Sequence, residues 1–124
     1  PVSVPSHCTL MKPAAEKFAE ALEQTAIELP RIPVIQNVNA EIATDVAQLR
    51  QALTAQLYQS VQWTRSMQYL QDQGIQSVVE CGPGTVLSNL AKRLPNIEKA
   101  FAIDSKARME DALNAVLVAE GKIA

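Results

Sequence analysis

Histidine and cysteine are scarce in this sequence, which has one histidine, His7, and two cysteines, Cys8 and Cys81, among 124 residues. The two cysteines lie far apart without the spacing of metal ligands, and a single histidine cannot complete a zinc site with them. We therefore expect no metal site within this chain. Two distant cysteines are also more typical of a reducing compartment than of a disulfide framework.

Strong charge imbalance and long apolar runs are absent as well. The chain has 11 Lys and Arg against 13 Asp and Glu, so its net charge is −2, and no basic run is long enough to bind nucleic acid. No apolar run approaches the ~20 residues that a membrane-spanning helix needs. We expect a protein that binds neither nucleic acid nor membrane and that lies in the cytoplasm.

What the sequence does contain is the pattern of an ordinary globular α/β domain, with 48% hydrophobic residues. Apolar residues recur at helical spacing over residues 13–29, 46–57, 63–73, 86–94 and 105–117. Short β-branched runs predict strands at 2–4, 32–38, 76–81 and 99–103, and the 32–38 run is apolar enough to be buried on both faces. Strands that alternate with helices predict a parallel sheet flanked by helices. No repeat, low-complexity segment or linker divides the chain.

His7 is the residue of greatest chemical interest, because its side chain has an unperturbed pKa suited to proton transfer near neutrality. Ser6 and Cys8 flank it, but side chains alternate in an extended segment, so neither neighbour is a natural partner. No serine here has the glycine-flanked G-x-S-x-G turn of an activated nucleophile. His7 is therefore either a base for a nucleophile outside these residues or a structural histidine bonded to a backbone carbonyl.

The turn Glu80-Cys81-Gly82-Pro83-Gly84-Thr85 is the other candidate site, since it leads from a predicted strand into a predicted helix. Its backbone N–H groups could bind an anion such as a nucleotide phosphate. It lacks the lysine of a phosphate loop and the three glycines of a dinucleotide site, so a structural turn is the favoured interpretation. Cys81 is expected to be a small buried residue at the end of its strand.

Five short blocks occur in a fixed order along the chain: Ser3-Val4-Pro5-Ser6-His7-Cys8 followed by Leu10-Met11-Lys12-Pro13, then Pro33-Val34-Ile35-Gln36-Asn37-Val38, Gln56-Leu57-Tyr58, Val61-Gln62-Trp63-Thr64 and Glu80-Cys81-Gly82-Pro83-Gly84. In this order the blocks resemble the C-terminal part of bacterial malonyl-CoA:acyl carrier protein transacylases. The resemblance implies that residues 1–124 are the C-terminal segment of an acyltransferase domain, in its larger, hydrolase-like subdomain. The nucleophile-bearing N-terminal part and the ferredoxin-like subdomain would lie outside this segment.

The resemblance also implies a function, namely malonyl transfer from coenzyme A to the phosphopantetheine thiol of acyl carrier protein in fatty acid biosynthesis. His7 would be the general base for a serine outside the segment, and the backbone carbonyl of Gln56 would orient it. Ser6 falls where related polyketide synthase domains vary with the acyl group, so it is a candidate substrate-binding residue. Malonyl-CoA and phosphopantetheine would be substrates, with no bound cofactor.

The implied partners are acyl carrier protein and the N-terminal part of the same enzyme, as a separate chain or otherwise. A basic group could attract the acidic carrier; its members are Lys92, Arg93, Lys99, Lys106 and Arg108. The segment alone is expected to be inactive. Two alternatives stay open: an acyltransferase of a polyketide synthase that uses another acyl-CoA, and a non-catalytic α/β interaction module.

Overall fold

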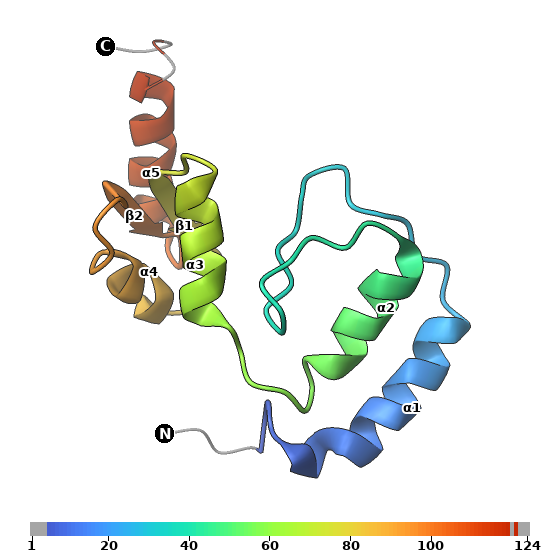
Figure 1. Ribbon diagram of the computed structural model, residues 1–124. Helices are drawn as coiled ribbons and strands as arrows, with labels where there is room; N and C mark the ends of the chain where they lie inside the picture. Colours follow the sequence, from blue (N-terminus) through green and yellow to red (C-terminus); the bar gives the residue numbers. More distant parts are fainter. Residues whose placement is uncertain (1–4, 120, 122–124) are drawn as a thin grey trace. The chain divides into compact units, whose positions relative to one another are not determined.

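The computed structural model describes residues 5–119 and 121, which form two compact units, one up to Tyr69 and one from Leu70. The boundary falls inside a helix and not in a linker. The elements in chain order are η1 (Thr9–Met11), α1 (Lys12–Glu23), α2 (Val46–Ala55), α3 (Trp63–Asp72), β1 (Ser77–Glu80), α4 (Val86–Ala91), β2 (Lys99–Ala102) and α5 (Lys106–Ala119) (Figure 1). The predicted strand at 2–4 lies outside the described residues.

In the first unit, α1 and α2 pack against each other through their apolar faces. Pro13 stands in the first turn of α1, where its missing N–H costs nothing, and Ala15 and Leu22 are buried two turns apart. Leu49 and Ala52 are the buried residues of α2. These small and medium side chains allow a close contact between the two helices.

Helix α1 is shorter than predicted, because it ends at Glu23 and not near Leu29. The Thr25 hydroxyl donates to the Ala21 carbonyl at 2.7 Å, which occupies an acceptor of the last turn. The Thr25 carbonyl in turn accepts a 2.7 Å hydrogen bond from the Arg50 guanidinium of α2. A helical continuation would need that carbonyl for Leu29, so the contact with α2 favours termination.

Helix α2 begins as predicted. Asp45 has extended backbone angles, and its side chain accepts a 2.8 Å hydrogen bond from the Gln48 backbone N–H. This is the geometry of a helix N-cap, which satisfies one of the free N–H groups of the first turn.

The prediction of a strand over Ile32–Val38 is wrong within the described structure. This segment has a single antiparallel bridge, between Ile35 and Ile42, and Ile32 is 79% exposed. The chain turns back at once, since the Gln36 N–H donates to Glu41 and the Ala40 N–H donates to Gln36, both at 2.8 Å. Ala40 reverses the chain with a φ of 58°. An apolar run becomes a strand only when a neighbour pairs with it, and the described residues supply one bridge.

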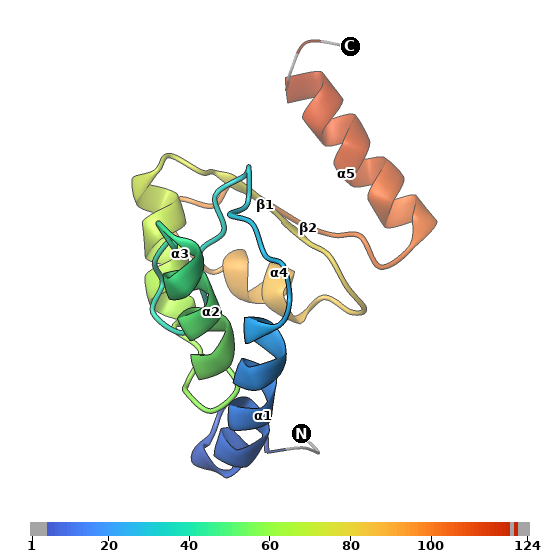
Figure 2. The same cartoon turned by 90° about the vertical axis from the view of Figure 1, so that its right-hand side faces the viewer.

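The second unit is a two-stranded parallel sheet flanked by helices, as the sequence predicts (Figure 2). Ser77 pairs with Lys99 and Glu80 with Ala102, and α4 lies in the crossover between the strands. Helices α4 and α5 both pack on β2. The core of this unit consists mainly of small side chains: Ser88, Ala91, Ile97, Ala102 and Ala112.

The prediction that Cys81 is buried is also wrong, because this thiol is exposed. Cys81 comes directly after the last residue of β1, where the chain leaves the sheet for the turn at Gly82. Its side chain therefore lacks the strand neighbours that the sequence pattern implied.

Candidate active site

His7 is held to the end of α2 by two hydrogen bonds. Its ring Nδ1 lies 2.7 Å from the Gln56 carbonyl oxygen, and its backbone N–H donates to the Leu57 carbonyl at 3.1 Å. The two acceptors are consecutive in the chain, so both the ring and the backbone of His7 are fixed to one short segment. The histidine side chain itself is exposed.

The backbone of His7 has a φ of 55°, in the left-handed region that residues with a Cβ rarely adopt. This conformation costs free energy, and it persists here because two hydrogen bonds and the turn into η1 over-determine it. Strain of this kind is characteristic of functional positions.

The two carbonyls are available because α2 ends there. The C-cap residue Gln56 donates its N–H to Ala52, and Leu57 and Tyr58 donate theirs to Thr54 and Ala55 in tight turns. The carbonyls at a helix C-terminus have no intrahelical donor and must find one elsewhere. At Gln56 and Leu57 the donor is His7.

The bond to Gln56 decides the tautomer of the ring. A carbonyl oxygen only accepts hydrogen bonds, so Nδ1 carries the proton. The neutral ring therefore has its lone pair on Nε2, where it can accept a proton from a substrate or a nucleophile. The carbonyl dipole would also stabilise the imidazolium after proton transfer.

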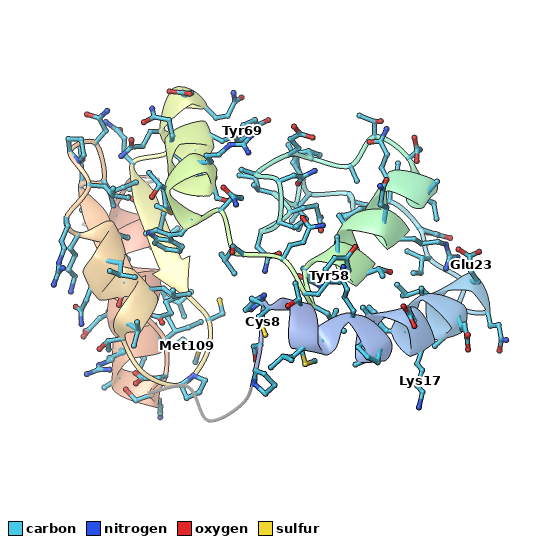
Figure 3. The ribbon with its side chains drawn as sticks, turned by 60° about the horizontal axis from the view of Figure 1, so that its bottom comes forward. Cys8, Lys17, Glu23, Tyr58, Tyr69 and Met109 are labelled. Carbon is cyan, nitrogen blue, oxygen red and sulfur yellow. The ribbon has the colours of Figure 1, made fainter. Side chains whose placement is uncertain are left out.

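The neighbours of His7 are Ser6, which is exposed, and Cys8, which is half-buried. The Cys8 thiol, whose side chain is labelled in Figure 3, donates to the Pro5 carbonyl at 3.3 Å. No hydrogen bond joins His7 to either side chain among the described contacts. The prediction of an extended segment at His7 is wrong, because Ser6 and His7 lie in a turn and His7 has a φ of 55°.

The turn after β1 does not form an anion site, because a carboxylate of the chain already occupies it. Glu80 accepts hydrogen bonds from the backbone N–H groups of Leu87 at 3.0 Å and Ser88 at 2.8 Å. The Ser88 N–H, with help from Leu87, holds the pKa of Glu80 below its ordinary value. A negative charge at this place repels a phosphate, so nucleotide binding at Gly82-Pro83-Gly84 finds no support.

Asp104, two residues after β2, forms a local ion pair with Arg108. Both of its carboxylate oxygens accept from the Arg108 guanidinium, at 2.7 and 2.9 Å. The Arg108 hydrogen bond holds the pKa of Asp104 below its ordinary value. This ion pair connects the residues before α5 to its first turn. It also occupies Arg108, one member of the basic group that was predicted to attract the carrier protein.

The described residues contain neither a metal-binding cluster nor a membrane-spanning helix. Residues 5–119 and 121 hold no cluster of His, Cys, Asp and Glu side chains that could bind a metal ion. Among those same residues, every helix is too short or too polar to cross a bilayer.

Fold and site together define a segment of an α/β protein that presents a histidine oriented as a proton acceptor. Two curated relatives, the malonyl CoA-acyl carrier protein transacylases of Salmonella typhimurium and Escherichia coli, are 46% and 45% identical over 91% of this chain. The chain spans about 37% of the length of these relatives. No family model matches the chain.

Solved structures give the same result. A crystal structure of FabD from Acinetobacter baumannii matches 96% of the chain at 92% identity with a TM-score of 0.90, and the match covers 38% of that protein. A malonyl-transacylase in complex with a type II polyketide synthase acyl carrier protein matches 92% of the chain at 43% identity with a TM-score of 0.85. In sequence and fold the chain is thus similar to a segment of malonyl CoA-acyl carrier protein transacylases, and the predicted resemblance is confirmed.

Sequence reasoning identified His7 and the Gln56 carbonyl as a candidate pair, and the structure brings them within 2.7 Å. It missed the Leu57 carbonyl and the left-handed backbone of His7. Neither has a residue-type signal, because any residue supplies a carbonyl and glycine is the usual marker of positive φ.

Proposed function

We propose that the whole protein containing this segment transfers a malonyl group from coenzyme A to the phosphopantetheine thiol of acyl carrier protein, in fatty acid biosynthesis. The observation that carries the proposal is the 2.7 Å contact from His7 Nδ1 to the Gln56 carbonyl, which leaves Nε2 free as a base. The names of the relatives supply the substrate classes.

In the first half-reaction, His7 Nε2 takes the proton of a serine hydroxyl from polypeptide outside these residues. The serine oxygen attacks the thioester carbonyl of malonyl-CoA, the C–S bond breaks, and the imidazolium returns the proton to the leaving thiolate. In the second, the phosphopantetheine thiol gives its proton to Nε2 and its sulfur attacks the carbonyl of the malonyl-serine ester. The C–O bond to the serine breaks, and the imidazolium returns the proton to the serine oxygen.

The Gln56 carbonyl, which orients His7 and carries no net charge, is a suitable partner for the base in acyl transfer from a thioester. A carbonyl stabilises the imidazolium less than a carboxylate does, but a thioester transfers its acyl group more readily than an amide. General base assistance of about 10²- to 10⁴-fold is then a sufficient contribution. Both steps use only side chains and substrates, so the proposal includes no bound cofactor.

Ser6 is proposed as a substrate-binding residue, because it is exposed and directly precedes the base. Acyl carrier protein is the proposed partner. The cytoplasm is the proposed location, in keeping with free Cys8 and Cys81 and with substrates that are coenzyme A and carrier thioesters.

The direct test is His7→Ala in the full-length protein. Malonyl transfer from malonyl-CoA to acyl carrier protein should fall by about 10²- to 10⁴-fold. Ser60→Ala, an exposed position in the same unit, is the matched control and should keep the parental rate. Circular dichroism of both variants shows whether the fold is retained. A folded His7→Ala protein with the parental rate would sink the proposal and favour a non-catalytic module.

A second candidate function is malonyl transfer to a polyketide synthase carrier, favoured by the similarity to a transacylase solved with a type II polyketide synthase acyl carrier protein. Assaying the full-length protein with carriers of both kinds and with malonyl-CoA against methylmalonyl-CoA decides between the two. A higher kcat/KM for the fatty acid synthase carrier with malonyl-CoA supports the first proposal.

A further inference from the structure

The segment that carries His7 meets the end of α2 at three points. Two are the hydrogen bonds of His7 to the Gln56 and Leu57 carbonyls. The third is a side-chain contact: the Lys12 ammonium lies over the Tyr58 ring, 5.8 Å from its centroid. Lys12 is the first residue of α1, and Tyr58 directly follows the two acceptor carbonyls.

The direction of each carbonyl is that of its peptide plane, which also carries the N–H group of the next residue. The turns after Ala55 hold these two planes through the Leu57 and Tyr58 N–H groups, which donate to Thr54 at 3.3 Å and to Ala55 at 3.1 Å, and the anchoring of the following residue adds to this hold. The Leu57 carbonyl belongs to the peptide that ends at the Tyr58 Cα. Anchoring the Tyr58 side chain therefore limits the rotation of that peptide plane.

The Tyr58 ring is anchored in the groove between the two helices. It is half-buried and lines a groove of about 510 Å³ together with Leu22 of α1 and Val46 and Thr54 of α2. Figure 3 shows the Tyr58 side chain beside α1, at the end of α2. The face of its ring receives the Lys12 cation, a contact that aromatic rings favour within about 6 Å.

We propose that Tyr58, assisted by Lys12, is a positioning residue of the catalytic base: it fixes the carbonyls that hold His7 in its productive orientation. This inference rests on the proposed function. The ring of His7 bonds to the Gln56 carbonyl and the Tyr58 ring receives Lys12, so the proposed effect acts through the backbone at Gln56 and Leu57. A base held loosely spends less time in line with its nucleophile, which lowers the rate of the chemical step.

The test compares four variants of the full-length protein in malonyl transfer. Tyr58→Leu should lower kcat about tenfold with KM for malonyl-CoA unchanged, since a displaced base affects the chemical step and not binding. Tyr58→Phe keeps the ring and should restore most of the rate. Lys12→Met should lower kcat about two- to fivefold, and Lys12→Arg, which also places a cation over the ring, should restore it.

A spectroscopic readout separates positioning from general destabilisation. In the parental protein, the Nδ1 proton of His7 should give an NMR signal protected from exchange by the Gln56 carbonyl. Tyr58→Leu should broaden or remove that signal while the thermal unfolding midpoint stays close to parental. Tyr69→Leu in α3 is the matched control and should leave both the signal and kcat unchanged.

The outcomes distinguish the two proposals. Parental kcat and a parental His7 signal in Tyr58→Leu, with His7→Ala inactive, would overturn the positioning role and leave the proposed function standing. Parental transfer in folded His7→Ala would overturn the proposed function itself. A Tyr58→Leu protein that raises KM but keeps kcat would contradict the positioning role as well.

Discussion

At the scale of single residues, the account rests on the orientation of one imidazole ring. His7 combines a left-handed backbone with hydrogen bonds from its ring and its N–H to adjacent carbonyls. The resemblance to transacylases pointed to His7 and to the Gln56 carbonyl. The hydrogen bond from the His7 N–H to the Leu57 carbonyl could not be predicted, because it depends on a backbone φ of 55° at His7. A histidine in the sequence does not indicate a positive φ, whereas a glycine would.

This geometry predicts the tautomer of free His7. At a pH where the ring is neutral, nitrogen-15 NMR of the full-length protein should show a protonated Nδ1 and an unprotonated Nε2, since the Gln56 carbonyl can only accept. Equal populations of both tautomers, as in an unconstrained histidine, would mean that the Gln56 contact does not hold in solution.

At the scale of secondary structure, the sequence predicted correctly those helices and strands whose stabilising contacts lie within the described residues. The start of α2 at Val46, the end of α3 at Asp72, and the two strands that contain Ser77 and Lys99 were predicted from periodicity and turn residues. The strand predicted at 32–38 does not form, because an apolar composition indicates burial but not the presence of a neighbouring strand to pair with. The end of α1 was misplaced because a long-range contact from Arg50 decides it.

The capping of α4 by the Glu80 carboxylate was not predicted from the sequence. The side chain of the N-cap residue Thr85 makes no capping bond, and the Glu80 carboxylate accepts from the Leu87 and Ser88 N–H groups instead. The carboxylate thereby connects the end of β1 to the start of α4 across the glycine-containing turn. A negative charge is also favoured at a helix N-terminus.

This arrangement predicts a pH-dependent contribution to stability. Because the folded pKa of Glu80 lies below its ordinary value of 4.5, its stabilisation is fully present above about pH 4.5 and is lost as the pH falls through the lowered pKa. Glu80→Gln in the full-length protein should therefore lower the thermal unfolding midpoint at pH 7, by an amount that shrinks below pH 4.5.

The control for that series is Glu110→Gln, which removes a 3.8 Å surface ion pair with Lys106 and should change the midpoint little. A Glu80→Gln protein with the parental midpoint at pH 7 would show that the carboxylate does not hold α4. A difference that grows on acidification would contradict the sign of the pKa shift.

At the scale of the whole molecule, the chain spans about 37% of the length of its curated relatives and leaves large apolar side chains exposed. In the second unit, Val86 of α4 is 70% exposed and Leu113 of α5 is 53% exposed. In the described residues, no large side chain is less than 2% exposed. The proposed activity is therefore to be measured on a protein of the relatives' length, in which we propose that the serine lies.

The central claim is that His7 supplies a proton acceptor and nothing else that the reaction requires. His7→Gly in the full-length protein tests it most directly, because glycine adopts a φ of 55° without strain and leaves room for a free imidazole. The account predicts that this variant is folded, transfers malonyl at most at about a hundredth of the parental rate, and recovers activity in a saturable way as imidazole is added. A folded His7→Gly protein that transfers malonyl at the parental rate without imidazole, or that stays inactive at every imidazole concentration while binding malonyl-CoA normally, would contradict it.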